Sequence, residues 1–206
     1  IGIGNNSGNA IILADGKLYY STGGGLSISA NNGQTFTNKN KDNGLPQNNL
    51  RGTAVSGSNV YAATDGSGLG VSTDGGNSFT TKTTANGLGN DFMYQVFAVG
   101  SNVYAGTAGG LSISTNSGNS FTNRTTTDGL GSNDVRHIFV SGSNVYAATH
   151  SGFSISTNGG LSFINRTTAN GLGNNYCYKV FVEGTNVYVA TIGGGIAIST
   201  DSGASF

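Results

Sequence analysis

The chain has 206 residues, and its nine basic and nine acidic side chains give a formal net charge of zero. It has no basic stripe or Lys/Arg cluster that would neutralise a nucleic acid backbone or bind an anionic membrane, so neither is expected as a partner. No apolar run approaches transmembrane length, and we expect no membrane insertion.

The only cysteine, Cys177, cannot form an intrachain disulfide. Such low cysteine content fits either a reduced compartment or a bacterial surface protein without disulfide bridges. We expect an exported bacterial protein that is extracellular, periplasmic or bound to the cell surface. Because the chain starts at Ile1 without Met, we also expect that a signal or an upstream domain has been removed. We interpret the Cys177 thiol as partly buried and not as a nucleophile.

The chain repeats itself at a period of 42 or 43 residues. The pentad Ser-Asn-Val-Tyr-Ala occurs at Ser58–Ala62, Ser101–Ala105 and Ser143–Ala147, with looser copies at Gly16–Tyr20 and Thr185–Val189. A fixed period of this size predicts one supersecondary unit copied in tandem. We predict a single domain, 1–206, with repeats at approximately 1–42, 43–85, 86–127, 128–169 and 170–206, the last of them incomplete.

Repeat four shows the predicted strands of one unit in chain order. They are Val135–Val140, Asn144–Thr149, Gly152–Thr157 and Ser162–Thr167. The first is an apolar run, as expected for a strand buried on both faces. The third alternates like a half-exposed strand, and the fourth is a polar outer strand. A linker from Thr168 to Gly173 leads to the next repeat, and no segment has helical periodicity.

Four short antiparallel strands in 42 residues, graded from apolar to polar, are typical of a β-propeller blade. The competing β-solenoid has shorter coils and lacks tight hairpins. We therefore predict an all-β propeller of five four-stranded antiparallel blades, or an excerpt of a larger propeller. The chain stops at Phe206, where the outer strand of repeat five should begin, and how a ring would close stays open.

The turn between the third and fourth strands carries the same motif in all repeats, as in Ser72-Thr73-Asp74-Gly75-Gly76-Asn77-Ser78-Phe79. This motif resembles the Asp-box (BNR) repeat, with Phe in place of Trp and Asn for Asp in three copies. The Asx side chain is expected to cap backbone N–H groups, Gly to take a positive φ, and the ring to pack between sheets. The structural Asx positions are Asn31, Asp74, Asn116, Asn158 and Asp201.

A second resemblance covers the linkers and the first two strands. Asn170–Asn175, Val180–Val182 and Asn186–Thr191 are similar to the repeats of two-component-regulator sensor propellers. Matching stretches begin at Gly44, Gly87 and Gly129, with a degraded copy at Gly2. Both families use the repeat as scaffold, so these resemblances imply the fold more than the function.

The copies differ where the first strand begins and in the loop between the second and third strands. We expect these positions to form a ring around one mouth of the propeller, where such folds bind ligands. Aromatic rings there could stack on sugars or peptide side chains, and Arg side chains could hold carboxylates. The alternative is that these are exposed loops whose aromatic side chains pack between blades. The candidate binding residues are Arg51, Phe92, Tyr94, Arg136, Tyr176, Tyr178 and Lys179.

One combination of residues in repeat four suggests a metal. Asp134, His137 and His150 offer a carboxylate and two imidazoles that could hold a divalent cation. No other repeat has this set, and both histidines could simply be exposed. We therefore predict no metal, and no cofactor either.

The Asp-box resemblance raises the question of sialidase chemistry, which needs an arginine triad and a tyrosine nucleophile. The chain has only four arginines, of which Arg124 and Arg166 occupy one repeated outer-strand position. Its only glutamate, Glu183, lies in a hairpin turn at the opposite end from the variable positions. A sialidase or another glycoside hydrolase is therefore not expected.

We predict a non-enzymatic binding or sensing module that takes a glycan or peptide ligand at the variable mouth. The alternative is a structural or protein-interaction domain of a larger surface or sensor protein. Similar repeats and an open sheet edge also predict self-association through repeats one and five.

Overall fold

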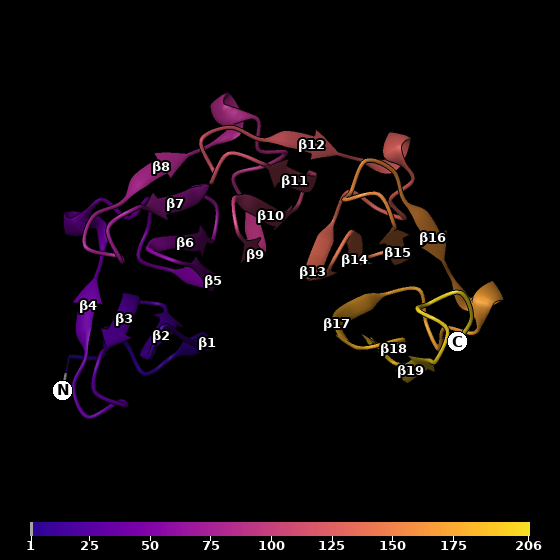
Figure 1. The fold of residues 1–206 in the computed structure, drawn as a ribbon, viewed down its shortest axis with the longest axis horizontal. Helices are drawn as coiled ribbons and strands as arrows, with labels where there is room; N and C mark the ends of the chain where they lie inside the picture. Colours follow the sequence, from indigo (N-terminus) through magenta and orange to yellow (C-terminus); the bar gives the residue numbers. More distant parts are fainter. Residues whose placement is uncertain (1) are drawn as a thin grey trace. The chain divides into compact units, whose positions relative to one another are not determined.

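A computed structural model describes residues 2–206, which form nineteen strands and four short 3₁₀ helices (Figure 1). Repeat one contains β1 (Gly8–Ala14), β2 (Lys17–Thr22), β3 (Gly25–Ser29), β4 (Thr37–Lys39) and the helix η1 (Lys41–Asn43). Repeat two contains β5 (Leu50–Ser56), β6 (Asn59–Thr64), β7 (Leu69–Ser72), β8 (Thr80–Lys82) and η2 (Thr84–Asn86). Repeat three contains β9 (Met93–Val99), β10 (Asn102–Thr107), β11 (Gly110–Ser114), β12 (Thr122–Arg124) and η3 (Thr126–Asp128).

The remaining elements follow the same plan. Repeat four contains β13 (Val135–Ser141), β14 (Asn144–Thr149), β15 (Gly152–Ser156), β16 (Ile164–Arg166) and η4 (Thr168–Asn170). Repeat five contains β17 (Cys177–Glu183), β18 (Asn186–Thr191) and β19 (Gly195–Ser199). Each repeat forms its own sheet, with neighbouring strands following the chain order. The predicted all-β propeller architecture is confirmed, with four sheets of four strands and a fifth of three.

The described chain divides into two compact units. The first comprises the chain up to Ala105 together with Ile113–Thr122, and the second comprises Gly106–Ser112 together with Asn123–Phe206. Among residues 2–206, no helix is long or apolar enough to cross a lipid bilayer.

Apolar side chains from neighbouring repeats form the core of each unit. In the first unit, Tyr19 and Leu26 of repeat one are buried with Val60 of repeat two, and Tyr61 and Val71 are buried with residues of repeat three. In the second unit, one cluster joins repeats four and five; it contains Tyr146, Phe153, Ile155, Val180, Val182, Val187, Val189 and Ala197. The core therefore lies between sheets, and each repeat depends on its neighbour for burial.

The predicted exposure of two strands of repeat four was wrong. β15 is buried along its whole length, because Ser154 and Ser156 alternate with apolar residues but are themselves fully enclosed. The Ser154 hydroxyl donates to Asn165 Oδ1 (3.1 Å) and accepts the Gly131 N–H (2.9 Å), which makes its burial possible. Conversely, β13 is not buried on both faces, since His137 and Phe139 keep part of their surface in solvent.

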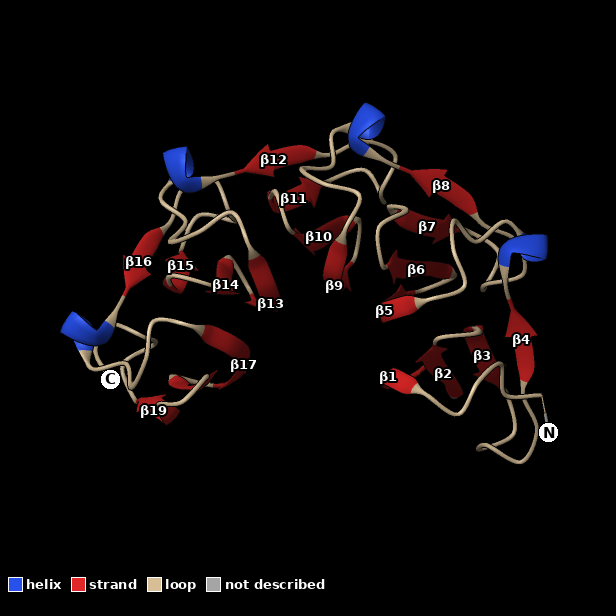
Figure 2. Ribbon diagram, turned by 180° about the vertical axis from the view of Figure 1, so that it is seen from behind, coloured by secondary structure: helices blue, strands red, loops and turns tan. Residues whose placement is uncertain are grey.

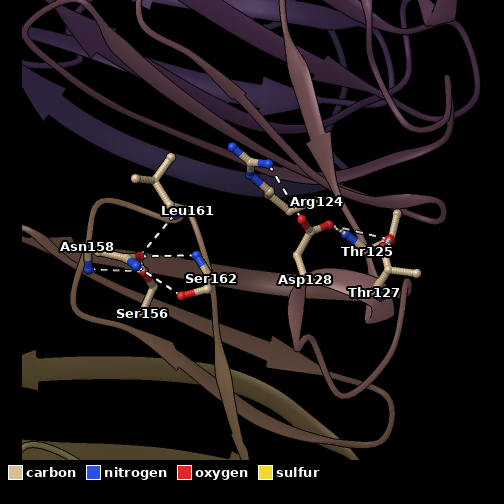
Figure 3. Close-up of polar contacts among 8 residues, drawn as sticks. All are labelled: Arg124, Thr125, Thr127, Asp128, Ser156, Asn158, Leu161 and Ser162. Atoms are coloured by element: carbon tan, nitrogen blue, oxygen red, sulfur yellow. Dashed lines mark hydrogen bonds and ion pairs between the residues drawn. The ribbon is translucent and has the colours of Figure 1, made fainter.

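The linkers contain 3₁₀ helices that the sequence analysis did not predict. Each helix directly follows the fourth strand of its repeat (Figure 2). In η3, the Thr127 N–H donates to Thr125 Oγ1 (3.3 Å) and the Thr125 N–H donates to the Asp128 carboxylate (2.8 Å; Figure 3). Gly129 ends the helix with φ 95°. A Cβ at this glycine would lie 2.1 Å from the Phe163 carbonyl oxygen, so backbone sterics require glycine there.

The turns between the third and fourth strands have the bonding predicted for the Asx position. Asn158 Oδ1 accepts hydrogen bonds from Ser156 Oγ (2.8 Å) and from the N–H groups of Leu161 and Ser162 (both 3.1 Å; Figure 3). Asp74 makes the equivalent bonds, and those from Ser78 and then Ser72 hold the pKa of its carboxyl group well below its usual range.

The glycine and the aromatic residue of these turns also behave as predicted. The glycines equivalent to Gly76 take φ between 81° and 91°. Phe79 and Phe121 are about nine-tenths buried in the clusters between repeats. In repeats two to five, one backbone hydrogen bond ties this turn to the hairpin between the first two strands, as from Gly159 N to Ser143 O (2.8 Å). We call this part of each repeat the turn end.

Candidate functional site

The variable positions of each repeat meet at the end opposite the turn end, which we call the variable end. There, a backbone N–H of the loop between the second and third strands donates to the carbonyl of the residue that begins the first-strand segment. The described bonds are Gly23 to Ser7, Asp65 to Asn49, His150 to Asp134 and Ile192 to Tyr176, at 2.9–3.1 Å. Two stretches that differ between repeats are thus held side by side by main-chain contacts that do not depend on side chains.

In the first unit, three of the candidate residues form one cluster. The Arg51 guanidinium donates to Asp65 Oδ1 (3.0 Å), and its Cζ lies 4.9 Å from the centre of the Phe92 ring. Phe92 in turn makes an edge-to-face contact with Tyr94, with ring centres 5.2 Å apart. Asn49 Nδ2 donates to the second oxygen of Asp65 (2.8 Å). The Arg51 guanidinium is therefore held between a carboxylate and an aromatic ring.

A cluster of the same kind lies in the second unit. Arg136 Nη2 donates to Asp134 Oδ2 (2.9 Å), and its Cζ lies 5.5 Å from the centre of the Tyr176 ring. The His150 ring meets Tyr176 edge to face, with ring centres 4.3 Å apart. Arg136 occupies the position in β13 that Arg51 occupies in β5, and Tyr176 occupies that of Phe92.

The carboxylate that pairs with the arginine comes from a different segment of the repeat in each cluster. Asp65 lies in the loop after the second strand, whereas Asp134 lies before the first strand, and these two places are joined by the backbone bond described above. The partner positions hold Asn49 in one cluster and His150 in the other. From the sequence, Asp134 stood out only as a metal candidate, and Asp65 lies in the loop between the second and third strands that was expected to vary between repeats. The link between the two positions appears only once the hairpin is folded.

Tyr178 and Lys179, the other two candidates, lie at the start of β17. Tyr178 is 48% exposed, and Lys179 is also exposed. Neither side chain has a described contact with the Arg136 cluster. They extend the accessible polar and aromatic surface of repeat five but do not belong to the cluster itself.

The three metal candidates do not form a site. Among residues 2–206, no group of three or more His, Cys, Asp or Glu side chains is arranged to hold a metal ion. Asp134 is bonded to Arg136, the His150 ring packs against Tyr176, and His137 Nδ1 accepts the Val180 N–H (3.5 Å). Burial, aided by the charge of Lys179, lowers the pKa of His137 to about 4, so this imidazole is neutral at pH 7.

Cys177 is buried in the core, and the outer-strand arginines Arg124 and Arg166 bond other groups of the fold. The Cys177 side chain is fully buried, more so than expected, and burial raises the pKa of its thiol to about 12. Such a thiol is not a nucleophile near neutral pH. Arg166 Nε donates to the Gly203 carbonyl of the next turn (3.1 Å), and Arg124 pairs with Asp128 (3.5 Å).

A cavity of about 280 Å³ in the first unit lies away from the Arg51 cluster of that unit. Its lining includes Lys17, Ile28, Asn31, Lys39 and Asn77, which belong to the outer part and the turn ends of repeats one and two. Lys39 Nζ donates to the Asn77 carbonyl across it (3.4 Å). No position of the variable end contributes to this cavity.

Solved structures with this architecture include several propellers. The extracellular domain of a hybrid two-component system from B. thetaiotaomicron matches with a TM-score of 0.80 at 17% identity, over 93% of this chain and 27% of that one. YCF48 bound to a D1 peptide matches with a TM-score of 0.65 at 16% identity, over 96% of this chain and 65% of that one. An ancestral GH74 enzyme matches over 71% of this chain and 22% of that one, with a TM-score of 0.55 at 24% identity.

These matches establish a repeat-type propeller fold. The chain spans about a quarter of the length of the first of these proteins and about two thirds of that of the second. No family model matches the sequence, and no curated protein matches it. The Asp-box resemblance therefore rests on the turn motif and its bonding, without support from a family match.

Proposed function

We propose that this chain is a binding or sensing module of an exported bacterial protein, and that it takes an acidic peptide segment at the variable end of its repeats. The observation that carries the proposal is the duplicated cluster in which Asp65 or Asp134 orients a guanidinium against an aromatic ring. A positioned guanidinium binds a carboxylate through parallel N–H···O bonds, and the ring restricts its orientation.

The fold neighbours support this class of function. One is an extracellular domain of a bacterial two-component system, and another was solved with a peptide bound. Both are under 25% identical to this chain, so their support for peptide sensing comes through the shared fold. The proposal includes no catalytic step, and the Asp65 and Asp134 carboxylates of the two clusters are occupied by arginine.

The test is a binding screen of the folded chain against an acidic peptide array, beside the double variant Arg51→Ala/Arg136→Ala. A charge-assisted hydrogen bond contributes roughly 1.5–3 kcal/mol, so we expect affinity to fall about 10- to 100-fold for each arginine that contacts the ligand. Arg51→Lys/Arg136→Lys, which keeps charge but loses the planar fork, should lose most of the same affinity.

Glu183→Gln is the matched control, because this exposed residue ends β17, next to the hairpin turn at the turn end. It should bind like the parent chain. Peptide binding that survives the double alanine substitution would contradict the proposed site. A folded chain that binds no peptide would contradict the proposed ligand.

A glycan is the second candidate ligand, favoured by the exposed ring of Tyr178 and by the partly exposed Tyr176, two residues before it in the chain. A glycan array with Tyr176→Ala/Tyr178→Ala as the comparison separates this possibility, since sugar stacking requires the rings and not the guanidinium groups. If neither array gives a hit, the structural or protein-interaction role gains support.

A further inference from the structure

Every pair of neighbouring repeats within a unit uses the same two sheet faces. In the second unit, Tyr146, Phe153 and Ile155 of repeat four are buried against Val180, Val182 and other residues of repeat five. We call the first set the forward face of a repeat and the second set its backward face. Strand register defines the equivalent positions in the other repeats.

The first unit contains this contact twice more. Tyr19 and Leu26 on the forward face of repeat one pack against Val60 and Leu50 on the backward face of repeat two. Tyr61 and Leu69 on the forward face of repeat two pack against the backward face of repeat three. The interface is therefore a standard one, made three times within the two units, with large apolar side chains on the forward face.

The forward face of repeat five is exposed. Ile196 and Ile198 are 69% and 54% exposed, whereas the equivalent Phe153 and Ile155 of repeat four are 0% and 9% exposed. Phe181 of β17 is 54% exposed and lies beside Tyr188, with ring centres 6.3 Å apart. Contiguous apolar side chains of this size on a soluble domain mark an interaction surface.

The backward face of repeat one is exposed as well. Ile11 and Leu13 of β1 are 62% and 71% exposed, whereas the equivalent Val180 and Val182 of repeat five are 3% and 6% exposed. Strand pairing confirms the equivalence, because Ile11 lies opposite Tyr20 as Val180 lies opposite Val189. The described residues thus present an exposed forward face on repeat five and an exposed backward face on repeat one.

We propose that the forward face of repeat five binds the backward face of repeat one of a second copy of this chain. A second copy supplies the aliphatic first-strand residues that a forward face buries in the three contacts seen within the units. The contact is heterologous, joining different surfaces of the two partners, and it continues an interface already present in the fold. It is a contact between sheet faces and does not require hydrogen bonding between strand edges.

The test is sedimentation velocity of the chain between about 1 µM and 1 mM, together with two variants that each disable one face. Ile196→Asp/Ile198→Asp removes the forward face of repeat five, and Ile11→Asp/Leu13→Asp removes the backward face of repeat one. The parent chain should associate as its concentration rises, and each variant alone should stay monomeric. An equimolar mixture of the two should form a 1:1 complex, because each retains the face that the other lacks.

Ile164→Asp is the matched control, since this isoleucine is 63% exposed but lies on the outer strand β16. It should associate like the parent chain. Circular dichroism of every variant checks that it is folded. A folded parent chain that stays monomeric at 1 mM, or a variant mixture that forms no complex, would overturn the proposal. Protection of both faces from hydrogen exchange in a monomer would overturn it too, by showing that they are covered within one chain.

Discussion

The two ends of each repeat differ in the hydrogen-bond partners of their side chains, which are backbone groups at the turn end and other side chains at the variable end. At the turn end, the Asx side chain and its serine bond the backbone of their own turn, and the phenylalanine fills the space beside the neighbouring repeat. At the variable end, backbone bonds hold the loops together, and the side chains bond one another near the surface. Stability should therefore be sensitive to substitution at the turn end, and binding to substitution at the variable end.

The strongest test of this comparison truncates an aromatic side chain at each end. Phe79→Ala should lower the free energy of unfolding by about 3–5 kcal/mol, because it leaves a cavity among Tyr19, Leu26 and Val60. Tyr178→Ala at the variable end should cost about 0.5 kcal/mol, since that ring is half exposed. Urea unfolding measures both, and equal losses would contradict the assignment of stability to the turn end.

Removing one buried hydroxyl at the turn end should have the next largest effect. Ser156 Oγ accepts the N–H groups of Asn158 (3.3 Å) and Gly160 (2.8 Å) and is almost fully buried. Ser156→Ala leaves these donors without that acceptor and should cost about 1–3 kcal/mol by chemical denaturation. Ser162→Ala, in the exposed part of the same turn, is the control and should cost less than half as much.

The stability of the fold should depend on pH through His137, a partly buried histidine near the variable end. The pKa of His137 in the folded protein is about 4, below its usual 6.5, so the unfolded chain binds the proton first as pH falls. Stability should fall by about 1–2 kcal/mol from pH 6.5 to pH 4.5. His137→Gln should remove most of this slope, whereas His150→Gln, at the exposed histidine, should retain it. A slope unchanged in His137→Gln would contradict the assignment.

The smallest expected change is in stability at the variable end. Arg51 is 39% exposed and its ion pair with Asp65 is solvated, so Arg51→Ala should change the free energy of unfolding by about 0–1 kcal/mol. Thermal denaturation in low and high salt measures this. A loss above about 2 kcal/mol would mean that the arginine cluster is a structural element like the Asx turns.

The strands could be predicted well from the sequence because the same turn signals recur in all five repeats. The hairpin at Gly142-Ser143 and the Asx turn at Asn158 fix where β13 to β16 begin and end. The exposure of β15 could not be predicted from its pattern, because alternating serines look like a solvent-facing row until their bonding partners are known. The 3₁₀ helices were not predicted because a helix of a single turn is too short to show a periodic pattern of apolar residues. Thr125 followed by Asp128 and Gly129 nevertheless carries a helix-capping signal.

The candidate site was predictable only as a region. Variation between repeats indicated the positions of Arg51, Phe92, Arg136 and Tyr176, and strand direction indicated the end at which they lie. That Asp65 and Asp134 play the same part from two different loops follows from hydrogen bonds across the hairpin. Asp134, His137 and His150 were weighed as metal ligands although no metal was predicted, and spacing alone cannot show that each of these groups already has another partner.

The standard contact between forward and backward faces bears on how such a chain changes during evolution. The contacts within the two units use the same pair of complementary sheet faces. A gene segment that encodes one whole repeat can therefore be duplicated or lost without a new kind of interface between repeats. Copy number and ligand choice can then change separately, the first by recombination between near-identical segments and the second by point substitution in the loops.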